Sequence, residues 1–272
     1  MVYLILAFCS SAMVSVLMRF SHRRVGRSLG MLAANYAVCT ALACLEAGFG
    51  SAGLNGPALW MGALNGFFYL AGFVMLQRSI GRSGVVLSAT FMKLGLLVTL
   101  VISTVFFGER PGGAQVTGFV LAVAAIVLMG GPSGEGRFHP GLLLLPLVGG
   151  MCDGMSKVYE ELGNPAFSGQ FLFDTFFTAL VLCFALAAWK KQLPGKWEWC
   201  FGALIGVPNF YASRFLLSSL ATVPGVIAYP AYAVAGILLV TLAGVFLFRE
   251  RLTKGQWVAM VLILAALVLL NL

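Results

Sequence analysis

Long apolar runs separated by short polar links are the feature of this sequence that most constrains its fold. An α-helix of about 20 apolar residues spans the hydrocarbon core of a bilayer. Lipid offers the backbone no hydrogen-bond partner, so continuous runs form helices, whereas a β-barrel would need short alternating strands. We therefore predict an all-α integral membrane protein with ten transmembrane helices. The runs lie at about residues 2–20, 29–47, 57–77, 83–107, 114–130, 141–161, 168–189, 197–217, 223–248 and 255–271.

The composition agrees with this prediction and excludes several other classes of protein. Hydrophobic residues make up 60% of the chain and charged residues only 10%, against about 25% charged residues in soluble domains. The net charge of +8 comes largely from short loops between apolar runs, which indicates membrane orientation rather than nucleic-acid binding. The six cysteines show no CxxC spacing, and no phosphate-loop or metal-binding motif occurs. We expect no cofactor, no metal and no nucleic-acid partner.

The two halves of the chain resemble each other. "WMGALNGFFY" at 60–69 matches "CFGALIGVPN" at 200–209, and residues 84–115 match residues 225–256 in register. Gly95 and Glu109 in the first half correspond to Gly236 and Glu250 in the second. We predict two five-helix repeats, at 1–135 and 138–272. An odd number of helices inverts the second repeat in the membrane, the plan of many secondary transporters, with a central site between the repeats and alternating access.

The basic residues predict the orientation. Thirteen of the 17 Lys and Arg residues fall in or beside the loops after helices 1, 3, 5, 7 and 9. The positive-inside rule makes that side cytoplasmic and puts both termini outside the cell membrane. The first run is apolar from its start and has no cleavage-site pattern, so we expect a retained span.

The ends of both repeats carry a family resemblance. "FFGERPGGAQVTGFVLAVAAIVLM" and "FLFRERLTKGQWVAMVLILAALVLLNL" resemble the close of each half in the EamA-like group of the drug/metabolite transporter superfamily. "AYAVAGILLVTLAGVFLFRERL" is also similar to the third helix of small multidrug resistance proteins. The resemblance implies ten helices, no enzymatic activity and transport of small organic solutes. Members of the EamA-like group usually have cytoplasmic termini, opposite to the charge distribution here.

The sequence departs from the multidrug proteins at one functional position. They bind cations through a Glu in their first helix, and the matching runs "LILAFCSSAMVSVLM" and "LLLLPLVGGMCDGM" contain none. Their cation/proton exchange mechanism therefore does not carry over to this chain.

Among the charged residues within the predicted spans, five are candidates for the membrane interior, whereas Glu160 and Glu161 lie nearer the outer interface. A charge at the bilayer centre costs roughly 2.5 to 3.5 kcal/mol even on mild scales, so such residues face a cavity or a partner. We expect Lys93 to anchor an anionic group of the substrate and Asp153 to act as its counter-charge or as a proton-coupling site. The alternative is that the charges only lock helices, as ion pairs of Asp153 with Lys157 and of Asp174 with Arg214. All five are Lys93, Asp153, Lys157, Asp174 and Arg214.

Polar and aromatic residues at similar depth are candidates for lining the substrate site. Tyrosine rings can stack on flat ligands or hold cations, and intramembrane amides can form hydrogen bonds between helices. The candidates are Tyr36, Asn65, Tyr69, Asn209, Tyr229 and Tyr232. Two GxxxG pairs at equivalent places in the repeats, Gly62/Gly66 and Gly202/Gly206, suit close helix packing. Pro224 and Pro230 can kink or break the ninth span.

Several functions are open at this stage. The first is a transporter of a polar metabolite or drug with Lys93 as anchor, and the second is an exporter of amines or aromatic cations that uses tyrosines and Asp153. A membrane protein without transport activity is the third. The fourth is an intramembrane protease, which the GxSG sequences around Ser83 and Ser133 suggest. Against it, a catalytic serine needs a base such as histidine to take its proton, and neither histidine lies in a span. Expected partners are a small-molecule substrate, the bilayer and a proton or another coupling ion, in a monomer or homodimer.

Overall fold

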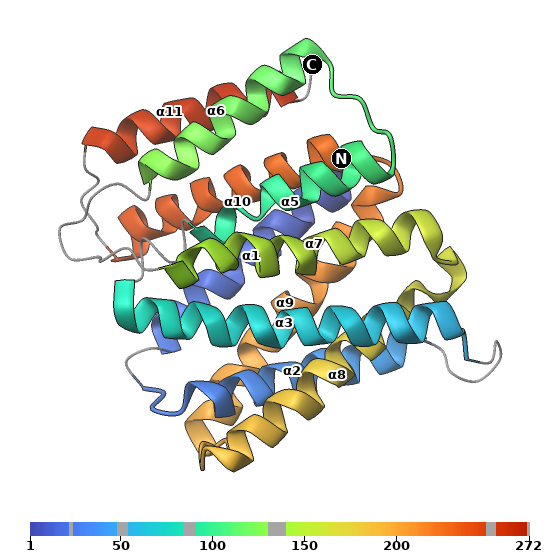
Figure 1. The fold of residues 1–272 in the computed structure, drawn as a ribbon. Coiled ribbons are helices and arrows are strands. Elements are labelled where there is room, and N and C mark those ends of the chain that lie inside the picture. The colour runs from blue at the N-terminus through green and yellow to red at the C-terminus, as the bar shows by residue number, and fades with distance from the viewer. Residues whose placement is uncertain (22–23, 48–53, 84–90, 130–139, 249–253, 271–272) are drawn as a thin grey trace. The chain divides into compact units, whose positions relative to one another are not determined.

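The computed structural model describes the chain except for residues 22–23, 48–53, 84–90, 130–139, 249–253 and 271–272 (Figure 1). Over the described residues it is helical and contains no β-strand, as the hydropathy pattern predicts. The helices are α1 (Val2–Ser21), α2 (Ser28–Ala47), α3 (Gly56–Ser83), α5 (Leu96–Val101), α6 (Gly113–Met129), α7 (Leu144–Leu162), α8 (Ser168–Trp189), α9 (Lys196–Leu220), α10 (Gly225–Phe248) and α11 (Lys254–Leu270). Three short helices supplement them: η1 (Ile102–Phe106), η2 (Pro140–Leu143) and η3 (Pro165–Phe167).

These elements account for the predicted spans. Within the described ranges, six helices are long and apolar enough to cross a membrane. Four shorter apolar segments lie at Val2–Met18, Phe91–Phe106, Gly113–Leu128 and Lys254–Leu270, where the other predicted spans are. The chain is therefore a multi-pass helical membrane protein. The division into two repeats stays a prediction.

The fourth predicted span is not one continuous helix. Its described part is helical at residues 91–93, turns at residues 94–95 and resumes as α5, which passes into the π-helix η1. No proline causes this break. The ninth span, by contrast, is continuous as α10, with Pro230 inside the helix and Pro224 directly before its first residue. Of the two effects considered for these prolines, a kink or a break, the structure excludes the break.

The described chain forms two compact units, and each is considered by itself. Unit 1 comprises Met1, Ala71–Lys157 and Ser219–Leu272. Its core lies between α5, α6, α10 and α11, and α6 and α11 run side by side (Figure 1). Alanines at this contact, including Ala122, Ala125 and Ala266, are fully buried and allow close packing of the helices.

Unit 2 comprises Val2–Leu70 and Val158–Ser218, and α2 packs along α8 within it. The two predicted GxxxG pairs form reciprocal contacts here. Gly62 and Gly66 of α3 lie against the backbone of α8, and Gly202 and Gly206 of α9 lie against the backbone of α2. A Cβ at Gly202 would lie 2.6 Å from the Met31 carbonyl oxygen, so only glycine permits this approach. Close packing at the GxxxG pairs is thus observed.

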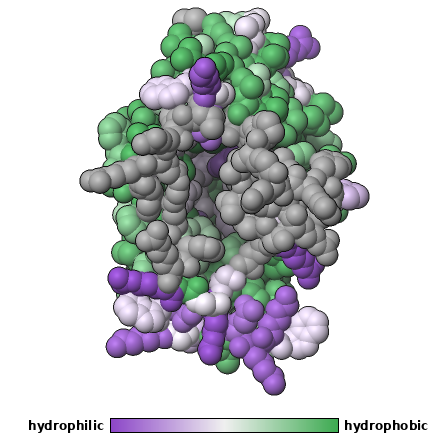
Figure 2. All heavy atoms as spheres, turned by 90° about the vertical axis from the view of Figure 1, so that its left-hand side faces the viewer, coloured by the Kyte–Doolittle hydropathy of each residue, from purple (hydrophilic) through white to green (hydrophobic). Residues whose placement is uncertain are grey.

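Exposed basic residues of unit 2 gather where the α1–α2 and α8–α9 connections meet. The Arg27 guanidinium donates to the Leu193 carbonyl at 3.2 Å, and Arg24 lies 5.4 Å from the Trp197 ring centroid. Lys190, Lys191 and Lys196 are also exposed nearby in the chain. Hydrophilic side chains gather at one end of the face in Figure 2. Both connections belong to the side that the charge distribution predicts to be cytoplasmic.

The reciprocal glycine contacts generate a prediction for stability. Replacing Gly66 with alanine should destabilise the protein by about 1–3 kcal/mol, as overpacking does. The new Cβ would meet the Thr175 carbonyl oxygen and lie 3.0 Å from the Ala179 nitrogen, both of which are backbone atoms that cannot rotate away. Gly236→Ala is the matched control because no atom of the described residues lies within 4 Å of a Cβ there. Unfolding in detergent measures the stability of both variants, and equal stabilities of Gly66→Ala and Gly236→Ala would contradict the packing described.

Candidate functional site

A glycine contact in unit 1 positions the charged residues of the candidate site. The turn in the broken span rests on α7, where a Cβ at Gly95 would lie 2.7 Å from the Gly150 nitrogen. Gly154, one turn further along α7, faces Ile102. Without side chains at these positions the two backbones approach directly. Lys93 therefore lies beside the face of α7 that carries Asp153.

Lys93 and Asp153 form the centre of this arrangement. Both side chains are only partly exposed, and their opposite charges interact electrostatically. The Lys93 ammonium also lies 5.8 Å from the centroid of the Tyr232 ring, within the range of a cation–π contact. One turn earlier on α10, the Tyr229 hydroxyl donates to the Asp153 backbone carbonyl at 2.8 Å. The structure thus brings four of the predicted site residues together.

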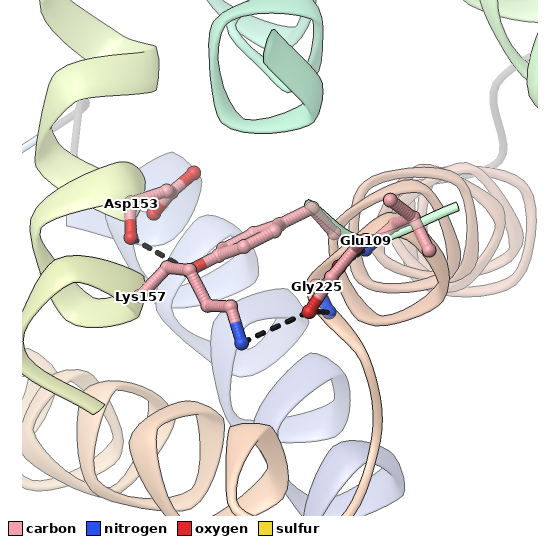
Figure 3. A network of polar contacts seen from close by, with 6 residues as sticks. Glu109, Asp153, Lys157 and Gly225 are labelled. Carbon is pink, nitrogen blue, oxygen red and sulfur yellow. Dashed lines mark hydrogen bonds and ion pairs between the residues drawn. The ribbon is translucent and has the colours of Figure 1, made fainter. Parts of the chain in front are cut away.

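A second group of contacts surrounds Glu109, in the turn between η1 and α6 (Figure 3). The Glu109 carboxylate accepts hydrogen bonds from the backbone nitrogens of Gly225 at 2.9 Å and Val226 at 2.8 Å, the first residues of α10. Lys157 of α7 forms an ion pair with the same carboxylate, with Nζ 2.9 Å from Oε1. Both side chains are largely buried, with 3% of Lys157 and 14% of Glu109 exposed.

This ion pair corrects one of our alternatives. The spacing of four residues on α7 suggested that Lys157 pairs with Asp153, and the observed ion pair is with Glu109 instead. Figure 3 shows the Lys157 side chain extending from α7 toward Glu109 and α10, away from the Asp153 carboxylate. Asp153 is left to interact with Lys93. Local helical spacing could not indicate a partner from another part of the chain.

The remaining predicted aromatic residues belong to unit 2. Phe176 of α8 is fully buried and lies at the centre of a ring cluster. Its ring centroid is 6.5 Å from that of Tyr36 and 5.9 Å from that of Tyr69. The Tyr69 hydroxyl forms a hydrogen bond of 3.0 Å with the hydroxyl of Ser213. Tyr36 is therefore packed in the interior of unit 2, and Tyr69 joins α3 to α9.

The predicted asparagines of unit 2 are also mostly enclosed. The Asn209 amide donates to the Asn35 side-chain oxygen at 3.3 Å, joining α9 to α2, and lies near Cys39. Asn65 is 1% exposed, and within the described part of the chain its side-chain oxygen has no hydrogen-bond partner. An unsatisfied buried oxygen is costly, so Asn65 is the best candidate in unit 2 for a contact with a bound solute.

Asp174 and Arg214 do not form the ion pair considered from the sequence. Arg214 of α9 donates from Nε to both carboxylate oxygens of Glu46, each at 2.9 Å, and from Nη1 to Ser218. Asp174 accepts a hydrogen bond from the Gln170 amide at 3.3 Å. Both groups are partly exposed; the Arg214 contact joins α9 to α2, whereas the Asp174 contact lies within α8.

Sequence reasoning missed Glu109 as a site residue. Its position after an apolar run resembles a solvated loop, and only its match with Glu250 in the second repeat distinguished it. Among the described residues, no three His, Cys, Asp or Glu side chains are arranged to hold a metal ion.

The Lys93–Asp153 interaction can be tested by a double-mutant cycle. Lys93→Met and Asp153→Asn should each destabilise the protein, because each leaves the other charge without its counter-charge. The double variant should lose less stability than the two single variants lose together, with a coupling free energy of roughly 0.5–3 kcal/mol. Unfolding in detergent measures the free energies, and the exposed Lys190→Met is the control. Additive effects would show that the two charges do not interact.

Comparisons with known proteins agree with this architecture. Residues 143–272 match the EamA-like transporter family. An uncharacterized protein of Haemophilus influenzae is 23% identical over 203 residues, which cover 72% of this chain and 69% of that protein. A protein of known crystal structure aligns with 99% of this chain and 98% of its own, with a TM-score of 0.74 and 18% identity, and so shares the fold. EamA-like proteins are transporters rather than enzymes. Residues 143–272 are therefore similar to the EamA-like transporter family, and the described helices make the chain a multi-pass membrane protein.

Proposed function

We propose that this protein is a secondary transporter that moves a small polar organic metabolite with an anionic group across the cell membrane by alternating access. The observation that carries the proposal is the position of Lys93 at a break in a membrane span. Broken helices form the substrate sites of many transporters, because their interrupted backbone and nearby charges can face a solute.

The surroundings of Lys93 suit a substrate that carries charge. An anionic group would bind the Lys93 ammonium, and a zwitterion could present its cationic group to Asp153 at the same time. Competition between a substrate anion and Asp153 for Lys93 would couple substrate binding to the arrangement of α7 and the broken span. Asp153 could carry a coupling proton when its counter-charge is engaged by the substrate.

A second candidate function is export of amines or aromatic cations. It is favoured by the ring of Tyr232, which already holds a cation, the Lys93 ammonium, at 5.8 Å. A substrate cation in that place would replace Lys93 over the ring and pair with Asp153. In this case the tyrosines of α10 and Asp153 form the substrate site, and the bound cation displaces the Lys93 ammonium from the Tyr232 ring.

The environment of the protein forms part of the proposal. We propose that it resides in the inner (plasma) membrane, with both termini outside the cytoplasm. The basic residues gathered at one end of unit 2 support this orientation, since Lys and Arg are retained on the cytoplasmic side. The working form is a monomer or a homodimer.

A ligand screen on the purified protein separates the two functions. Binding to the folded state raises the apparent melting temperature, so a metabolite library grouped by charge should yield anionic or zwitterionic ligands. Lys93→Ala should weaken their binding about tenfold to a hundredfold, the loss of one charged hydrogen bond, and Lys93→Arg should retain most of it. Cationic ligands alone, with binding lost in Asp153→Asn and kept in Lys93→Ala, would favour the amine exporter. Unchanged anion binding in Lys93→Ala would refute the role of Lys93.

A further inference from the structure

The first turn of α10 already contains a bound carboxylate. The first backbone N–H groups of a helix have no partner within the helix and carry the positive end of its dipole, so they attract anions. At α10 this place is taken by Glu109, whose two oxygens accept hydrogen bonds from Gly225 and Val226. The carboxylate comes from the chain itself, from a residue far away in the sequence.

A buried cation completes the recognition of this carboxylate. Lys157 Nζ lies 2.9 Å from Glu109 Oε1, and Lys157 is only 3% exposed. The centroid of the Phe107 ring lies 5.9 Å from the same ammonium. A buried ammonium requires a negative partner. Two backbone donors and one ammonium therefore converge on one anion position.

An independent observation indicates that this anion position has a further hydrogen-bond donor available. Ser103 is completely buried, and its hydroxyl oxygen has no hydrogen-bond partner among the described residues. A Cβ on Gly225 would collide with this oxygen, so the hydroxyl lies directly beside the first residue of α10. It belongs to the π-helix η1, an irregularity that is frequent at functional sites. A hydroxyl is a suitable additional donor to an anion.

We infer that the first turn of α10, with Lys157 and Ser103, is an anion-binding site for a small monovalent carboxylate, which Glu109 occupies as an internal ligand. The residue before Glu109 is Gly108, with a φ of 68°, which favours glycine in the turn that presents the carboxylate. Glu109 competes with an external carboxylate, and binding of the external anion releases the turn from α10. The inference does not depend on Lys93 or on transport.

Chemical rescue of a variant that lacks the internal ligand tests this inference. Glu109→Ala should be less stable than the wild type, and formate should raise its apparent melting temperature with saturation. The half-saturating formate concentration should be at least about tenfold lower than in the wild type, where Glu109 competes. Ser103→Ala added to Glu109→Ala should weaken the formate effect. The double variant Glu109→Ala/Lys157→Met should lose it, and Glu109→Ala/Lys93→Ala should keep it.

Matched controls separate a specific site from a general salt effect. Sodium chloride at equal ionic strength measures the effect of salt alone. Glu198→Ala removes another buried glutamate, one that accepts hydrogen bonds from the backbone nitrogens of Gly195 at 3.1 Å and Arg27 at 3.3 Å. No lysine ion pair with Glu198 is present in the described structure, so formate should not rescue this variant.

The outcomes are decisive in both directions. Saturable rescue of Glu109→Ala that requires Lys157 supports the site. Equal formate effects in Glu109→Ala, Glu198→Ala and the wild type overturn it. If Glu109→Ala does not fold in ordinary buffer, extraction in formate or acetate replaces the titration. Recovery of folded protein only with these anions supports the inference, and recovery with neither contradicts it.

Discussion

The direct backbone contact between the broken span and α7 is the constraint on which the candidate site depends. Gly95 and Gly150 meet without intervening side chains, so the turn of the span lies on the surface of α7. Lys93 precedes this contact by two residues and Asp153 follows it by three. The same contact therefore brings a cation and an anion close together in apolar surroundings, where either charge alone would be costly. Tyr229 and Tyr232 add α10 to the arrangement.

Charge of alternating sign extends through unit 1 from this point. Lys93 interacts with Asp153, and one turn along α7 Lys157 pairs with Glu109. Each of these four charges has an opposite charge nearby, as the cost of moving an ion out of water favours. Asp153 and Lys157 share a face of α7, because residues four apart in a helix do. A displacement of α7 would therefore alter both charge pairs together.

Much of the fold could be predicted from hydropathy, and much of the site could not. The ends of α2, α8 and α10 lie within two residues of the predicted runs, because transfer of apolar side chains into lipid determines where a span begins and ends. The break after Lys93 had no such signal. Gly95 and Gly236 occupy equivalent places in the predicted repeats, but α10 continues through Gly236, where no described atom lies within 4 Å of a Cβ. The difference arises from tertiary contact with Gly150, as does the choice of Glu109 as partner for Lys157.

The reciprocal packing in unit 2 has a consequence for biosynthesis. α2 and α3 emerge from the ribosome long before α8 and α9, the helices against which their closest surfaces pack. The glycine faces of the first half must therefore stay exposed to lipid until the second half is inserted. Completion of unit 2 depends on contacts between residues far apart in the sequence, which form late in folding. The first half of the chain is consequently an unfinished structure, and it is the arrival of α8 and α9 that completes it.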